Sequence, residues 1–164
     1  MLKRILNLLP HALAIFMAII FMDSLRYKFT NAPETIVIFQ EKLDNWAASW
    51  GAAGLFAQTG LFSQYVIGSI ELLASTLLLI GILPRYRHLQ AGGALAGLLV
   101  MTGATNFHLF TPLGIDPNND GGGLFVAACI VWASALLMVS VLRRKEFLIL
   151  VRRVLAIFAP LPQS

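Results

Sequence analysis

The chain has 164 residues, of which 58% are hydrophobic and 12% are charged. A soluble domain is about half apolar and about a quarter charged, and a compact fold of this length could not bury so much apolar surface, so the composition excludes an ordinary soluble domain. The formal net charge is +4, but the basic residues form short groups at the ends of apolar runs, which excludes a continuous nucleic-acid-binding face.

Four apolar segments predict membrane-spanning helices, because about 20 helical residues are needed to cross about 30 Å of hydrocarbon. The first covers roughly residues 5–22. It lacks a cleavage site of small residues, so we interpret it as a retained helix rather than a cleaved signal. The others cover roughly residues 61–83, 91–110 and 124–142. The predicted fold is an all-α integral membrane four-helix bundle, a single domain over residues 1–164.

The long segment between the first two spans predicts an amphipathic helix over residues 33–50. Asn31 is placed to cap this helix, Pro33 lies in its first turn, and Glu34 lies near the positive end of the helix dipole. Apolar residues recur on one face at helical spacing, namely Ile36, Phe39, Leu43, Trp46 and Trp50. We expect the helix to lie at the outer interface, with its tryptophans at headgroup depth, or to cap the mouth of the bundle; both can hold.

Two further segments lie outside the predicted spans. Residues 111–123 are rich in turn formers, and Asp120 is placed to cap the fourth span. Residues 147–158 are apolar but too short to cross a bilayer, and Arg152 and Arg153 interrupt them. We expect a short surface helix there, where basic side chains meet anionic lipid.

The distribution of basic residues predicts the orientation in the membrane. If the spans alternate in direction, nine basic residues fall on one side, and only Arg26, Lys28 and Lys42 fall on the other. The nine are Lys3, Arg4, Arg85, Arg87, Arg143, Arg144, Lys145, Arg152 and Arg153. The positive-inside rule then places both termini in the cytoplasm. We expect the membrane to be a bacterial-type inner membrane.

Glu71 is the most informative polar residue, because it lies near the middle of the second predicted span. A charge in hydrocarbon costs about 2.5–3.5 kcal/mol on insertion scales. Glu71 must therefore face the bundle interior, be protonated or meet a partner.

Other polar residues are expected in the outer half of the bundle with Glu71. Thr102 lies at similar depth in the third span, while Asn106 and His108 lie one to two turns further out. The candidate pocket is completed by Tyr65 in the second span and by Arg26 and Lys28 after the first. One interpretation is an outward-opening pocket for a small molecule or a quinone, or a proton-linked site. The other is a structural hydrogen-bond network that fixes helix packing.

Several other chemistries are disfavoured by the sequence. A haem held by His11 and His108 would need ligands at similar depth, whereas they lie about 9 and 26 Å from the cytoplasmic boundary. The single cysteine, Cys129, allows neither an intrachain disulfide nor a CxxC pair, and we expect it to be a small apolar filler. Gly93 and Gly97 form a GxxxG pair, for which we expect packing inside the bundle. No hydrolase, metalloprotease, Walker or dinucleotide motif is present.

Four stretches in this order resemble the DoxX family, including its DoxX-like and MauE-type relatives. They are Arg26-Tyr27-Lys28-Phe29 followed by Ala32-Pro33-Glu34-Thr35; Gly68-Ser69-Ile70-Glu71-Leu72-Leu73; Met101-Thr102-Gly103-Ala104 leading to His108-Leu109-Phe110-Thr111-Pro112; and Asn118-Asn119-Asp120-Gly121-Gly122-Gly123. The resemblance implies a four-helix membrane bundle. It also implies that Lys28, Glu71 and the region from His108 to Pro112 match recurrent positions of the family. The absence of a cysteine pair sets this chain apart from members that act in thiol chemistry.

The resemblance implies an accessory or small subunit of a membrane-associated redox system, with a quinone as the cofactor it could meet. The alternative is a non-enzymatic assembly or stabilising subunit of a larger membrane complex, for which the interfacial helix and the tail suit docking. A small carrier is disfavoured because the spans are short and unbroken and show no repeat symmetry. The expected partners are membrane lipids and other membrane proteins, and no catalytic residue is assigned.

Overall fold

A computed structural model describes the backbone of residues 2–157 and the side chains of residues 7–157. Over this range the chain is all-helical. Three helices are long and apolar enough to cross a membrane, Asn7–Phe29, Pro84–Phe110 and Gly123–Leu142, and a fourth apolar helix, Gln64–Ile80, is shorter. This is the helix composition of a small multi-pass membrane protein.

Helix α1 spans Leu2–Phe29 and continues seven residues beyond the end expected from hydropathy. Arg26 and Lys28 therefore lie in its last turn, where cations interact favourably with the helix dipole, rather than after the helix. The chain then turns at Asn31, whose φ is 54°. The prediction that Asn31 caps the next helix is wrong, because Ala32 occupies the cap position and makes no side-chain cap bond.

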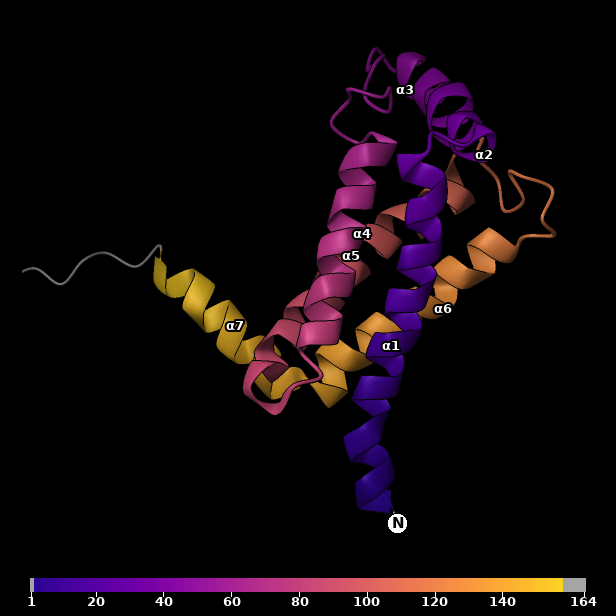
Figure 1. The fold of residues 1–164 in the computed structure, drawn as a ribbon. Helices are drawn as coiled ribbons and strands as arrows, with labels where there is room; N and C mark the ends of the chain where they lie inside the picture. The colour runs from indigo at the N-terminus through magenta and orange to yellow at the C-terminus, as the bar shows by residue number, and fades with distance from the viewer. Residues whose placement is uncertain (1, 158–164) are drawn as a thin grey trace, which may run out of the picture.

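The predicted amphipathic helix forms as three consecutive segments, α2 (Pro33–Ile36), the π-helix η1 (Val37–Asp44) and α3 (Asn45–Ala48). Its apolar face, which includes Phe39 and Leu43, packs with Phe56, Leu113 and Phe107 in a cluster separate from the main core. This layer covers one end of the bundle, at the top of Figure 1, which we call the capped end. The expected capping arrangement is therefore present, while Trp50 stays exposed.

Helix α4 (Gln64–Ile80) begins where Ser63 Oγ accepts a hydrogen bond from Val66 N. A short 3-10 turn, η2 (Pro84–Tyr86), leads into α5 (Arg87–Phe110). Gly93 permits the close approach of α5 to α4, because a Cβ there would lie 2.7 Å from the carbonyl oxygen of Ala74. Gly97 faces Met17 and Phe21 of α1 in the same way, so the GxxxG pair serves packing inside the bundle, as predicted.

Helix α6 (Gly123–Leu137) starts after the glycine-rich loop and continues as a π-helix, η3 (Met138–Leu142), before α7 (Arg144–Ile157). Gly122, not Asp120, occupies the cap position of α6. Asp120, two residues earlier, still accepts from Leu124 N in the first turn and from Gly122 N, so its side chain caps the start of the helix from outside that position. Figure 1 shows α1 and α4 side by side, α5 behind them and α6 crossing obliquely. Helix α7 leaves the bundle at the opposite end from the cap, which we call the basic end; the expected final residue of this helix, 158, lies outside the described range.

Candidate functional site

A buried ion pair joins α1 to α4 in the half of the bundle near the capped end. Lys28 Nζ lies 2.9 Å from Glu71 Oε2 and 3.0 Å from Oε1, so one ammonium serves both carboxylate oxygens. The side chains are 12% and 2% exposed. Ser24, one turn earlier on α1, accepts a further hydrogen bond from Lys28 Nζ. The pair thus cancels the two charges where isolated charges would be costly.

The surroundings of this pair hold the end of α1 in place. Gln64, at the start of α4, donates from Nε2 to the Lys28 carbonyl at 2.9 Å and to Asn31 Oδ1 at 2.8 Å. Gln58 Nε2 donates to the same Asn31 oxygen at 3.0 Å. Asn31 therefore serves as an acceptor that ties the turn after α1 to the start of α4.

A quinone head group beside Glu71 does not fit this arrangement. Both carboxylate oxygens accept from Lys28, and almost none of the Glu71 surface is open. A quinone would have to break the ion pair before either side chain could hydrogen-bond to it. A shallow depression of about 390 Å³ adjoins Tyr65 on α4, but Glu71 does not line it.

The remaining candidates from the first two spans lie near the ion pair without joining it. Tyr65 stacks on Phe29 with ring centroids 6.3 Å apart. Arg26 is exposed and pairs with Asp23 at 3.1 Å on the same helix. Of the candidates on these two helices, then, only Lys28 and Glu71 are in direct polar contact with each other in the described part of the chain.

His108 belongs to a different local structure. Its Nδ1 lies 2.6 Å from the Gly114 carbonyl oxygen, so the ring donates to the loop that follows α5. The ring also packs against Phe125 of α6, with centroids 5.5 Å apart. His108 is buried, and these contacts hold the loop against the bundle.

Thr102 and Asn106 face outward from α5 rather than towards Glu71. Both side chains are exposed, and Asn106 Nδ2 donates to the Thr102 carbonyl at 2.7 Å. Trp132 of α6 donates from Nε1 to Thr102 Oγ1 at 2.9 Å. The expected polar set therefore divides into a buried ion pair, a buried histidine and an outward-facing group on α5 and α6.

Outside the apolar spans, local contacts shift the pKa values of two side chains, Asp120 and Arg143. The backbone N–H of Leu124 is the main cause that holds the pKa of Asp120 below its ordinary value, with Asp116 and Gly122 adding to it. Burial lowers the pKa of Arg143 at the basic end, and nearby Arg87 acts in the same direction.

Sequence reasoning missed a second polar group, at the basic end. Arg143, Gln90 and His11 form a chain of contacts from three different helical regions. Arg143 looked like an ordinary topology signal because it stands in a basic run after an apolar span. The one sequence feature that could have indicated this group is Gln90, a polar residue directly before the predicted span 91–110; the structure shows that it is buried.

Comparison of the chain with protein-family models, with curated proteins and with solved structures finds no match.

Proposed function

We propose that this chain is a DoxX-like accessory subunit that stabilises a larger membrane complex, and that this complex belongs to a membrane-associated redox system. The proposal combines the resemblance in the sequence with the placement of the polar side chains. The buried ion pair supports a structural role for Glu71, because it fixes α1 to α4 and leaves no room for a ligand.

The observation that carries the docking role is a stripe along α5, made of Leu99, Thr102, Asn106 and Leu109. These positions follow one another at spacings of three or four residues, so they share one helix face. Leu99 and Leu109 are 64% and 56% exposed, and both polar residues between them are exposed as well. The stripe is a surface that meets either lipid or another protein.

Polar groups on this stripe favour a protein neighbour. Thr102 lies eight residues before the end of α5, about 12 Å along the helix, and so within the apolar span. Asn106 Oδ1 accepts no hydrogen bond from the described residues. An adjacent transmembrane helix could donate to it, and interhelical bonds of this kind contribute about 1 kcal/mol in membranes.

Site-specific photo-crosslinking in native membranes tests the proposal. A benzophenone amino acid at Leu99 or Leu109 should crosslink to one defined membrane protein, while the same probe at exposed Leu73 on α4 should not. Asn106→Leu should weaken the Leu109 crosslink without lowering the melting temperature of the isolated chain. Crosslinks to lipid alone at both stripe positions would refute the docking role, and a partner without any redox function would refute the redox assignment.

A further inference from the structure

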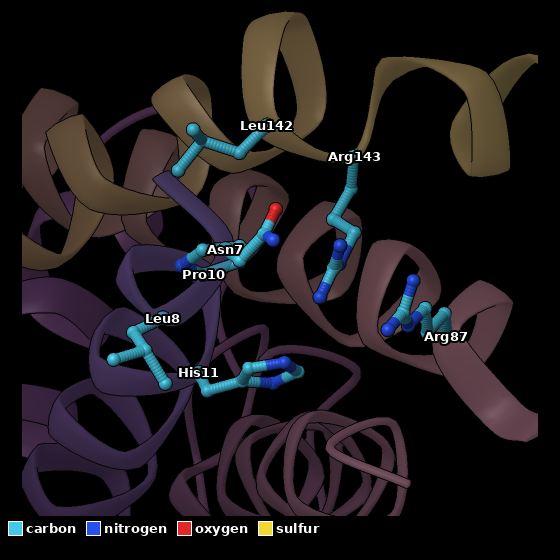
Figure 2. Close-up of a pocket in the computed structure, with 7 residues that line it drawn as sticks. All are labelled: Asn7, Leu8, Pro10, His11, Arg87, Leu142 and Arg143. Carbon is cyan, nitrogen blue, oxygen red and sulfur yellow. The ribbon is translucent and has the colours of Figure 1, made fainter. Parts of the chain in front are cut away.

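A cavity of about 320 Å³ opens between α1, the start of α5 and the junction of η3 with α7. Its polar lining comes from Asn7 and His11 of α1, Arg87 of α5 and Arg143. Figure 2 shows the two guanidinium groups side by side on one wall of this hollow, with His11 and Asn7 across from them. Two cations thus share one small cavity at the basic end of the bundle.

The π-helix before Arg143 directs its side chain inward. Arg143 N donates to the Met138 carbonyl at 2.7 Å, a bond that spans five residues instead of four. The backbone then leaves helical geometry at Arg143, with φ −121° and ψ 22°, before α7 begins. Single π-turns of this kind are frequent at functional sites, because the extra residue re-aims a side chain.

Arg143 is buried but incompletely satisfied. It is only 7% exposed, and its Nε donates to Gln90 Oε1 at 2.6 Å. Gln90 is fully buried and reaches His11 Nδ1 with its own amide at 3.4 Å. Arg143 Nη2 has no hydrogen-bond partner among the residues that the structure describes. A buried N–H donor without an acceptor costs about 1–3 kcal/mol, and more on a charged group, so a ligand that accepts from Nη2 would relieve this cost.

No carboxylate lines the cavity among the described residues. Among the described side chains at this end, seven basic residues are accompanied by a single acidic one, Glu146, which acts on Arg143 only from beyond ion-pair distance. The proximity of Arg87 adds like-charge repulsion at the cavity. An anion from outside the chain would neutralise this charge.

We propose that this cavity binds a phosphate group, with Arg143 and Arg87 as the charged donors. A guanidinium fork matches phosphate oxygens in geometry as well as charge. In membrane proteins, basic pockets between transmembrane helices on the cytoplasmic side bind the head groups of anionic lipids. Leu8, which is exposed, and Leu142 lie at the same cavity and offer an apolar surface to the rest of a lipid. A soluble phosphate ester has the same binding chemistry and is the other source.

Native mass spectrometry of the full-length protein in detergent tests this site. The probes are dioleoyl phosphatidylglycerol, dioleoyl phosphatidylcholine and glycerol 3-phosphate. We expect retained phosphatidylglycerol adducts and few phosphatidylcholine adducts. Arg87→Gln should weaken phosphatidylglycerol binding about tenfold, the equivalent of one charge-assisted contact. Arg85→Gln is the matched control, because Arg85 is exposed and close in the chain but does not line the cavity.

Arg143 also donates a hydrogen bond to the buried Gln90, so a variant that removes its charge could lose binding by misfolding. A second, charge-conserving variant therefore separates loss of binding from loss of the fold. Arg143→Lys keeps the charge but removes the fork, and it should weaken binding while a thermal melt shows a folded protein. Binding of glycerol 3-phosphate that displaces phosphatidylglycerol, or that occurs without lipid binding, would assign the site to the soluble source. Equal losses in Arg85→Gln and Arg87→Gln would show unspecific surface attraction and overturn the proposal. Equal binding of the two lipids without any binding of glycerol 3-phosphate would overturn it as well.

Discussion

The Lys28–Glu71 pair offers a direct measurement of what fixes α1 to α4. Lys28→Met leaves Glu71 alone at 2% exposure, near the middle of its helix. Removing one partner of a buried pair costs about 3–5 kcal/mol. A lone carboxyl group in the membrane limits this cost by taking up a proton. We therefore expect a loss of about 3 kcal/mol for Lys28→Met.

Glu71→Gln should cost less, about 2 kcal/mol, for two reasons. The amide oxygen can still accept a hydrogen bond from Lys28, and the lysine lies in the last turn of α1, from which its ammonium can extend towards the capped end. If the two residues act as a unit, the double variant should lose no more than the worse single variant. The double-mutant cycle should then give a coupling free energy of about 2 kcal/mol.

Reversible unfolding in mixed detergent micelles, titrated with dodecyl sulfate, measures these free energies. Arg26→Gln is the matched control, because Arg26 forms an ion pair on the same helix with both side chains largely exposed. Exposed pairs contribute about 0–1 kcal/mol, so this control should unfold close to the wild type. Additive losses in the double variant would show that the ion pair does not contribute as a pair, and the structural role of Glu71 would have to be abandoned.

Two further predictions concern packing and capping. Gly93→Val should destabilise the bundle by about 1–3 kcal/mol, because a Cβ at this position would lie 2.7 Å from the Ala74 carbonyl oxygen. Gly103→Ala is the control and should be neutral in the same unfolding assay, because the nearest atom to a Cβ there lies 3.9 Å away. Asp120→Ala should lower the melting temperature at neutral pH by removing the acceptor for Leu124 N. Because the folded pKa of Asp120 lies below its ordinary value near 3.8, this stabilisation is present above about pH 5 and is lost as the pH falls through the folded pKa. Wild type and variant should therefore differ in melting temperature at pH 7, and the difference should shrink only as the pH falls below about 3.8; a difference that keeps its size as the solution is acidified would contradict the capping role.

Hydropathy and turn chemistry predicted most of the architecture. The four apolar helices, the capping layer, the GxxxG packing and the Asp120 cap all follow from residue types at fixed spacing. Glu71 was identified as a residue that needs a partner, because the cost of a buried charge is independent of the fold. Its partner was not identified from the residues alone, because hydropathy ended the first span at residue 22, whereas α1 continues to Phe29.

The parts that could not be predicted depend on small local changes in backbone geometry. The π-turn before Arg143 inserts one residue into a helix without altering the apolar pattern, yet it turns a basic side chain from the surface into a cavity. Thr102 and Asn106 face outward rather than towards Glu71, because counting residues gives a position along the helix but not the direction in which a side chain points. His108 finds its acceptor only after the loop to Gly114 has folded back.

The shortness of α4 has a consequence for the surrounding bilayer. Its 17 residues extend about 25 Å, less than the roughly 30 Å of hydrocarbon that the longer helices can cross. If α4 crosses a bilayer as the longer helices can, lipids beside α4 would have to compress to match it while those beside α5 would not, so the protein would impose an uneven bilayer thickness around its own perimeter. Such a mismatch costs fractions of a kcal/mol per ångström, and it would draw the protein towards thin regions of the membrane or towards a neighbour that shields this side.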